Sequence, residues 1–156
     1  MDYKMIHYTV EKSIATITLD YAPTLNALDM NMSLEVESAL HEAEADQAVK
    51  VVVLAGAGRA FSGGGDIRFM KAHCDEPDFA KESMGPLAGK LSEIVLYMKK
   101  MSKIVICAVA GACAGGAANL ALPVTSSMPQ TMQNSCRPLS ASVSVRIRAA
   151  CTPSRA

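Results

Sequence analysis

The sequence predicts an α/β fold. Two short continuous apolar runs, KVVVLAG (50–56) and KIVICAVAG (103–111), have the composition of strands that are covered on both faces of a sheet. Two longer segments, 29–46 and 86–101, carry apolar residues at the spacing of an amphipathic helix. Because these strands and helices alternate, we expect them to pack in layers, and 156 residues suit one domain.

The elements in the first half of the chain have clear local signals. Segment 13–19 (SIATITL) alternates as a strand does, and segment 29–46 follows as a helix that Asp29 or Asn31 can cap. The expected buried stripe of this helix is Val36, Ala39, Leu40 and Ala43.

The helix predicted over 86–101 ends in lysines, which suit a C-terminus, and residues 73–86 before it are expected to form a loop. The expected buried stripe of this helix is Leu87, Leu91, Ile94, Val95 and Met98.

Charge and cysteine content exclude several classes of protein. The formal net charge is zero, so the chain lacks the basic surface that nucleic-acid binding needs. The five cysteines contain no C-x-x-C pair, which predicts reduced intracellular thiols and neither a disulfide framework nor a metal site. The N-terminus lacks an apolar signal core, which indicates a cytoplasmic protein. Segment 104–122 is uncharged, but its glycines favour a buried strand and helix over a membrane span.

Two glycine-rich segments share one plan. VVVLAGAGRAFSGGGDI (51–67) and IVICAVAGACAGGAANLAL (104–122) each run from an apolar strand through a loop to consecutive glycines and a helix start. Backbone N–H groups at such positions are unpaired and attract negative charge. Neither segment fits a P-loop or the G-x-G-x-x-G pattern. The alternatives are structural turns alone or two segments that converge on one developing oxyanion, and the repeated context favours the second.

Together with NAL (26–28), these segments resemble the crotonase, or enoyl-CoA hydratase/isomerase, superfamily over residues 6–122, about half of the family's domain. The resemblance implies a spiral of ββα units, here truncated, and an acyl-CoA thioester as substrate, with coenzyme A entering as part of it and with no separate cofactor or metal. It implies that the backbone N–H groups of Gly65 and Gly116 hold the thioester oxygen. The coenzyme A contacts that it implies are at Ala27, Leu28, Ala60, Ser62, Gly63, Gly65, Asp66, Ile67, Arg68 and Gly116.

One position departs from the hydratase pattern. Hydratases of the family carry a catalytic glutamate three residues after the second oxyanion glycine, where this chain has Asn119. An amide cannot act as a general acid or base at neutral pH. The resemblance therefore implies an isomerase-like protein. The alternative is that Asn119 is a structural helix residue whose amide forms hydrogen bonds with backbone groups.

The remaining candidates are weaker. Three isolated histidines, a cysteine without a histidine partner and four methionines are expected to be structural. These residues are His7, His41, His73, Cys113, Met70, Met84, Met98 and Met101.

Residues 123–156 differ in composition from the rest of the chain. They contain four arginines and no acid, which leaves 15 acidic and 11 basic side chains in residues 1–122. If one base were lost near codon 122, the original codons would begin at the third base of each reported codon. In that frame the bases that encode Met128-Pro129 contain an alanine codon, and further positions allow a Pro-Asp-x-Gly-Gly turn. In isomerase-like members the aspartate of that turn is the acid/base. The hypothesis is a frameshifted, poorly ordered tail; the alternative is a divergent tail with an edge strand at 140–149.

These observations predict an enoyl-thioester isomerase-type reaction for the parental protein and little or no activity for this chain. The alternatives are a non-catalytic acyl-CoA- or partner-binding protein and a small membrane-associated protein. The family forms trimers and hexamers, an assembly expected to be impaired in a chain that lacks the second half of the domain.

Overall fold

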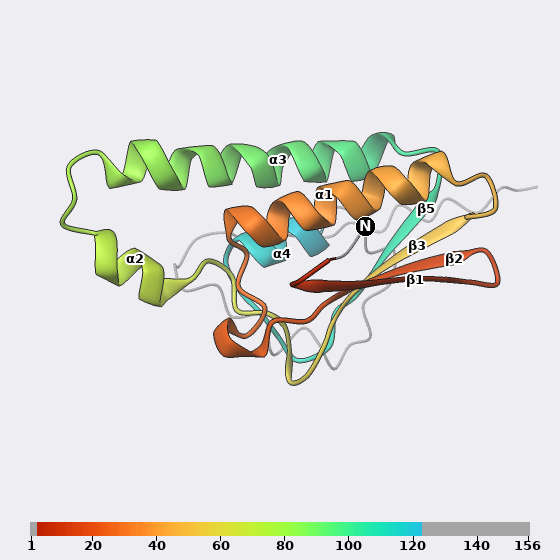
Figure 1. Cartoon of the computed structure of the whole chain (residues 1–156), viewed down its shortest axis with the longest axis horizontal. Coiled ribbons are helices and arrows are strands. Elements are labelled where there is room, and N and C mark those ends of the chain that lie inside the picture. The colour runs from red at the N-terminus through yellow and green to blue at the C-terminus, as the bar shows by residue number, and fades with distance from the viewer. Residues whose placement is uncertain (1–2, 123–156) are drawn as a thin grey trace, which may run out of the picture.

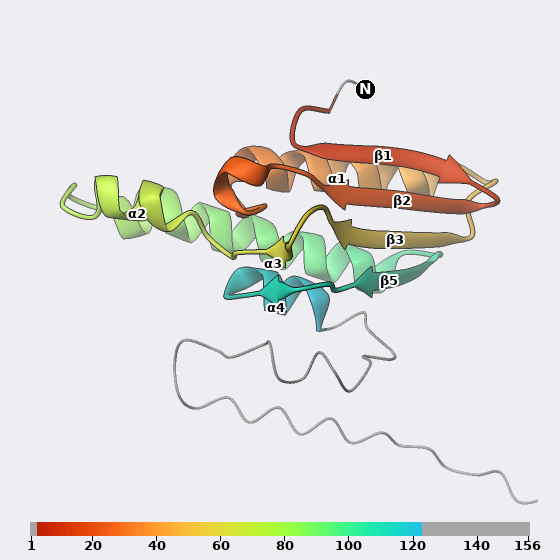
Figure 2. The same cartoon turned by 90° about the horizontal axis from the view of Figure 1, so that it is seen from below.

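A four-stranded sheet forms the centre of the molecule. The computed structural model describes residues 3–122 of the chain. The strand order is β1-β2-β3-β5, with β1 antiparallel to β2 and the other pairs parallel (Figure 2). The strands are β1 (Ile6–Glu11), β2 (Ile14–Leu19), β3 (Val51–Gly56) and β5 (Ile104–Ala108).

Two long helices, α1 (Met30–Ala45) and α3 (Gly85–Lys100), cover one face of this sheet (Figure 1). Both were predicted within one residue of their observed bounds. The Asp29 carboxylate caps α1 by accepting a 2.8 Å hydrogen bond from the N–H of Met32, as one of the two predicted caps. The predicted stripe of α1 is buried, whereas in α3 only Ile94 and Met98 are fully buried.

The sheet is covered on one face within the described residues. The side chains that point toward the helices, such as Ile17 and Leu54, are fully buried. On the opposite face Ile14, Val51 and Ile104 lie in one cross-strand row, where Ile14 is 40% and Ile104 65% exposed. The expectation of strands buried on both faces is therefore wrong here, because no described element packs on that side.

A second, two-stranded sheet lies beyond the ends of β3 and β5. It pairs β4 (Ala60–Ser62) in parallel with β6 (Ala112–Cys113). Each short strand leads through glycines into a short helix, α2 (Ile67–His73) and α4 (Gly116–Ala121). The strand predicted over 103–111 is shorter in the structure, where β5 ends at Ala108 and β6 begins only at Ala112.

The segment predicted as a loop, 73–86, is partly helical. A π-helical turn (η2, Ala80–Met84) runs directly into α3, and the Gly85 N–H donates to the Ala80 carbonyl. The remaining single-turn element is a 3₁₀ helix (η1, Ala22–Thr24). No helix in residues 3–122 is long and apolar enough to cross a membrane. The boundary expected at 122/123, the frameshifted tail and the alternative edge strand at 140–149 lie outside the described residues.

Candidate functional site

The small sheet brings the two glycine segments into contact. The carbonyl of Ser62 at the end of β4 accepts a 3.2 Å hydrogen bond from the N–H of Ala114 after β6. Gly64 lies so close to the second segment that a Cβ built on it would be 2.7 Å from the Ala114 oxygen. Gly64 also has φ +88°, so glycine is required here for its conformation as well as its size.

The two predicted oxyanion donors flank this contact. Gly65 follows Gly64, and Gly116 is the first residue of α4. Among the described residues, neither the Gly65 N–H nor the Gly116 N–H donates a hydrogen bond. Both glycines are only partly buried and lie on adjoining segments, so their N–H groups are accessible to a further hydrogen-bond partner.

Asn26 fixes the loop before α1 to the first glycine segment. Its buried amide donates to the carbonyls of Ala57, Ala60 and Phe61 at 3.0–3.3 Å, and its Oδ1 accepts from the Tyr21 N–H at 2.7 Å. Its φ is +56°, a conformation that asparagine tolerates better than most residues. NAL is part of the family resemblance, but no role was predicted for this asparagine; the available signal in the sequence was an asparagine that follows a proline-containing turn.

Backbone hydrogen bonds complete the link between loop and glycines. The Leu28 N–H donates to the Gly64 carbonyl at 2.7 Å, and the Gly63 N–H donates to the Leu25 carbonyl at 2.8 Å. The buried Ser62 hydroxyl accepts from the Gly64 N–H at 3.1 Å. The conformation of the glycine segment is therefore set by contacts on both sides, which leaves the Gly65 N–H as its unpaired donor.

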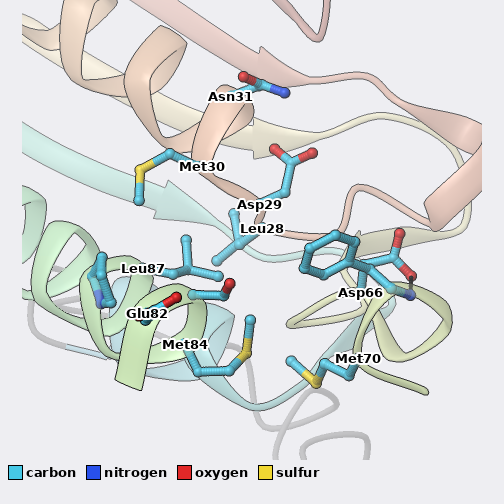
Figure 3. Close-up of a pocket in the computed structure, with 12 residues that line it drawn as sticks. Leu28, Asp29, Met30, Asn31, Asp66, Met70, Glu82, Met84 and Leu87 are labelled. Atoms are coloured by element: carbon cyan, nitrogen blue, oxygen red, sulfur yellow. Dashed lines mark hydrogen bonds between the residues drawn. The ribbon is translucent and has the colours of Figure 1, made fainter. Parts of the chain in front are cut away.

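A cavity of about 360 Å³ is lined in part by Asp66, the residue that follows Gly65 (Figure 3). Three parts of the chain line it: the start of α1, the α2 region, and the segment from η2 into α3. Most lining side chains are apolar, as in typical small-molecule sites. The lining residues are Leu28, Asp29, Met30, Asn31, Asp66, Phe69, Met70, Glu82, Ser83, Met84, Pro86 and Leu87.

Side chains from α2 and α3 connect the cavity with the two glycines. A Cβ on Gly65 would overlap the methyl of Met70, which lines the cavity. A Cβ on Gly116 would lie 3.2 Å from Cδ1 of Leu91, one helical turn after the cavity residue Leu87. The cavity and both unpaired N–H groups thus belong to one region of the molecule.

The predicted coenzyme A contacts are distributed differently. Leu28 and Asp66 line the cavity, and Asp66 caps α2 by accepting from the N–H groups of Arg68 and Phe69 at 2.9 and 3.2 Å. Ile67 and Arg68 are exposed, and the Arg68 guanidinium donates to the Pro23 carbonyl. The side chains of Ala27, Ala60 and Ser62 are buried, so only their backbone could meet a ligand.

The weaker candidates are placed as follows. Asn119 is exposed on α4 and does not line the cavity. His7 pairs with Asp20 at 2.9 Å, away from the cavity. Met70 and Met84 line the cavity, and Met98 is in the core.

His41 packs against Tyr97, and His73 contacts Phe69. Cys107 and Cys113 are buried, and burial raises the pKa of the Cys107 thiol to about 12. No group of three or more potential metal ligands is found within residues 3–122.

Comparison with known proteins places the chain in a family. Residues 9–126 match the family model for enoyl-CoA hydratase/isomerase. A trans-2-decenoyl-[acyl-carrier-protein] isomerase of Streptococcus mutans is 32% identical over 122 residues, which are 78% of this chain and 46% of that protein. A 1,2-epoxyphenylacetyl-CoA isomerase of Escherichia coli is 32% identical over 123 residues, 78% of this chain and 45% of that protein.

Solved structures agree with the sequence match. The crystal structure of an enoyl-CoA hydratase/isomerase from Xanthobacter autotrophicus Py2 superposes with a TM-score of 0.70 at 36% identity and covers 79% of this chain and 45% of that one. The fold class is therefore confirmed, and the chain spans about half the length of the relatives it matches. The chain belongs to the enoyl-CoA hydratase/isomerase (crotonase) family.

Proposed function

We propose that residues 1–122 bind an acyl-CoA thioester and stabilise the enolate that forms when a proton leaves the carbon beside its carbonyl. The observation that carries this proposal is the pair of unpaired N–H groups of Gly65 and Gly116 on backbone segments that touch through Gly64 and Ala114. The adjoining apolar cavity offers space for the acyl group. Donors of this kind contribute about 3 kcal/mol each when they meet developing negative charge.

The reaction is double-bond isomerisation rather than hydration. Addition of water needs a general acid/base at the position of Asn119, and an amide cannot transfer protons at neutral pH. Isomerisation moves one proton between two carbons of the same substrate, so a single acid/base suffices. The name of one relative, a trans-2-decenoyl-[acyl-carrier-protein] isomerase, supports this choice.

Turnover by this chain is expected to be slow, because α4 (Gly116–Ala121) carries no ionisable side chain. A protein that binds acyl-CoA without converting it is therefore the second candidate, and Asn119 is the residue that favours it. The two candidates share the same binding step. They differ in whether 3-hexenoyl-CoA is converted to the conjugated 2-enoyl product, which is followed by its ultraviolet absorbance.

Binding itself is tested by calorimetry with two ligands. Hexanoyl-CoA has the thioester oxygen, whereas S-hexyl-CoA, a thioether, lacks it. Gly65→Pro removes one N–H, and the loss of one hydrogen bond of about 1 kcal/mol predicts an affinity for hexanoyl-CoA that is several-fold weaker. Affinity for S-hexyl-CoA should stay unchanged, which also controls for folding. Equal effects on both ligands, or no binding of hexanoyl-CoA, would contradict the proposal.

A further inference from the structure

The cavity contains one carboxylate that the fold does not use. Three carboxylates line the cavity: Asp29, Asp66 and Glu82. Asp29 and Asp66 accept hydrogen bonds from backbone N–H groups at the starts of α1 and α2. The Glu82 carboxylate has no hydrogen bond and no ion pair with any described residue. Two of the three acids therefore have a structural role, and Glu82 has none.

Glu82 also lacks a counter-charge. No lysine, arginine or histidine is among the cavity-lining residues. Figure 3 shows Glu82 on the same side as Met84 and Leu87, with Leu28 and Asp29 across the cavity. Glu82 is an exposed residue on this mainly apolar wall, so its carboxylate is accessible both from solvent and from the cavity.

The backbone around Glu82 is unusual. Glu82 is the central residue of the π-helical turn Ala80–Met84, and such turns are rare and frequently occur at functional sites. The turn begins after Asp78, a non-glycine residue with φ +65°, whose carbonyl accepts from the N–H groups of Lys81 and Glu82 at 2.8 Å. This local geometry carries Glu82, Ser83 and Met84 together onto the cavity wall.

We infer that Glu82 is the acid/base that moves the proton in the proposed isomerisation, an inference that rests on the proposed function. The Glu82 carboxylate takes a proton from C2 of a 3-enoyl thioester, so that the C2–H bond breaks and its electron pair delocalises onto the thioester oxygen at Gly65 and Gly116. The Glu82 carboxyl, whose proton exchanges with solvent because the residue is exposed, then delivers a proton to C4, and the double bond lies between C2 and C3. The step consumes no water and needs no oxidant or reductant.

The placement of the carboxylate fits this role. Asp66 and Met70 line the cavity near Gly65, and the segment that carries Glu82 continues through Leu87 to Leu91, whose Cδ1 would lie 3.2 Å from a Cβ on Gly116. A thioester with its oxygen at the two glycines would extend its acyl chain into this cavity. Glu82 is the carboxylate there that can change its protonation without breaking a helix cap.

The test is exchange of substrate protons with solvent. The full 156-residue chain is incubated with 3-hexenoyl-CoA in D₂O, and deuterium at C2 and C4 is measured by NMR. Affinity for hexanoyl-CoA is measured in parallel by calorimetry. Because general acid–base catalysis contributes about 10²–10⁴-fold, Glu82→Gln should lower the exchange rate at least about 10²-fold with little change in affinity. Glu82→Asp should restore part of the rate.

Matched variants separate the possible outcomes. Glu76→Gln removes an exposed carboxylate outside the cavity and should leave exchange and affinity unchanged. Asp29→Asn and Asp66→Asn preserve the helix caps, since asparagine caps as well as aspartate. Unchanged exchange in Glu82→Gln, or exchange lost only in one of the two aspartate variants, would overturn the role of Glu82.

The wild-type measurement keeps the two proposals apart. If the chain binds hexanoyl-CoA but exchanges no proton above the rate in buffer, the role of Glu82 is wrong while the binding proposal stands. If hexanoyl-CoA does not bind, the proposed function fails and this inference fails with it.

Discussion

The main-chain N–H of Leu28 donates a 2.7 Å hydrogen bond to the carbonyl oxygen of Gly64. This bond joins the loop that leads into α1 to the triple glycine before α2. On its other side Gly64 abuts Ala114, so it is held between two parts of the chain far apart in sequence. The position of the neighbouring Gly65 N–H therefore depends on how closely these three segments approach one another.

Gly64→Ala should destabilise the protein by at least about 2 kcal/mol. A positive φ costs a non-glycine residue about 1–2 kcal/mol, and the new Cβ would also press on the Ala114 carbonyl. The free energy of unfolding is measured by urea denaturation. Gly89→Ala is the matched control, because Gly89 lies inside α3 with no atom near its missing Cβ. That change should stabilise by about 0.5–1 kcal/mol, and equal effects of the two changes would refute the argument.

Asn26→Ala should lower the free energy of unfolding by about 2 kcal/mol or more. It leaves the Tyr21 N–H and three carbonyls without the buried amide that pairs them, and each unsatisfied buried group costs about 1–3 kcal/mol. Asn26→Gly separates this loss from the cost of the positive φ, which glycine does not incur. If Asn26→Gly is as stable as the wild type, the side-chain hydrogen bonds contribute little and the interpretation is wrong.

The long helices could be predicted because their signals are local. The apolar stripe of α1 and its cap at Asp29 lie within one continuous segment, and the lysines that end α3 do too. The contact between Gly64 and Ala114 could be predicted only as a convergence of two similar motifs. Its geometry depends on strand pairing between β4 and β6, which involves residues about fifty positions apart.

Two features could not be found from sequence alone. The π-helical turn that carries Glu82 lies in a polar, Pro- and Gly-containing stretch that has the composition of a loop. The open outer face of the sheet is likewise absent from the pattern, since Ile104 and Ile106 belong to a continuous apolar run that reads as buried on both faces. Packing between distant segments decides both features.

Cys107 should resist thiol labelling in the folded protein. Burial raises its thiol pKa from 9.0 to about 12, and the thiolate is the reactive form. At pH 8, iodoacetamide should modify the exposed Cys74 far faster than Cys107, as measured by tandem mass spectrometry of tryptic peptides. Addition of urea should abolish the difference. Comparable rates in the native protein would show that β5 opens readily.

The same shift predicts how stability depends on pH. The folded state keeps the Cys107 thiol protonated, whereas the unfolded chain releases this proton near pH 9. The contribution is therefore fully present below about pH 9 and is lost as pH rises toward about 12. Cys107→Ala should show a smaller loss of stability over this range than the wild type in urea denaturation. Parallel curves would contradict the assignment.

Met70 should limit which acyl groups can approach Gly65. Its methyl lies so close to Gly65 that it would overlap a Cβ on this residue, whose N–H is proposed to hold the thioester oxygen. Met70→Ala removes the thioether and opens space next to the carbon that carries the transferred proton. A pocket that gains room for one methyl group changes discrimination by about 1–3 kcal/mol. The affinity for 2-methylhexanoyl-CoA relative to hexanoyl-CoA should therefore rise about tenfold or more in calorimetry. Met84→Ala, which enlarges another part of the same cavity, should leave this ratio near its wild-type value. A similar change in both variants would mean that the cavity volume as a whole, and not the thioether over Gly65, sets the preference.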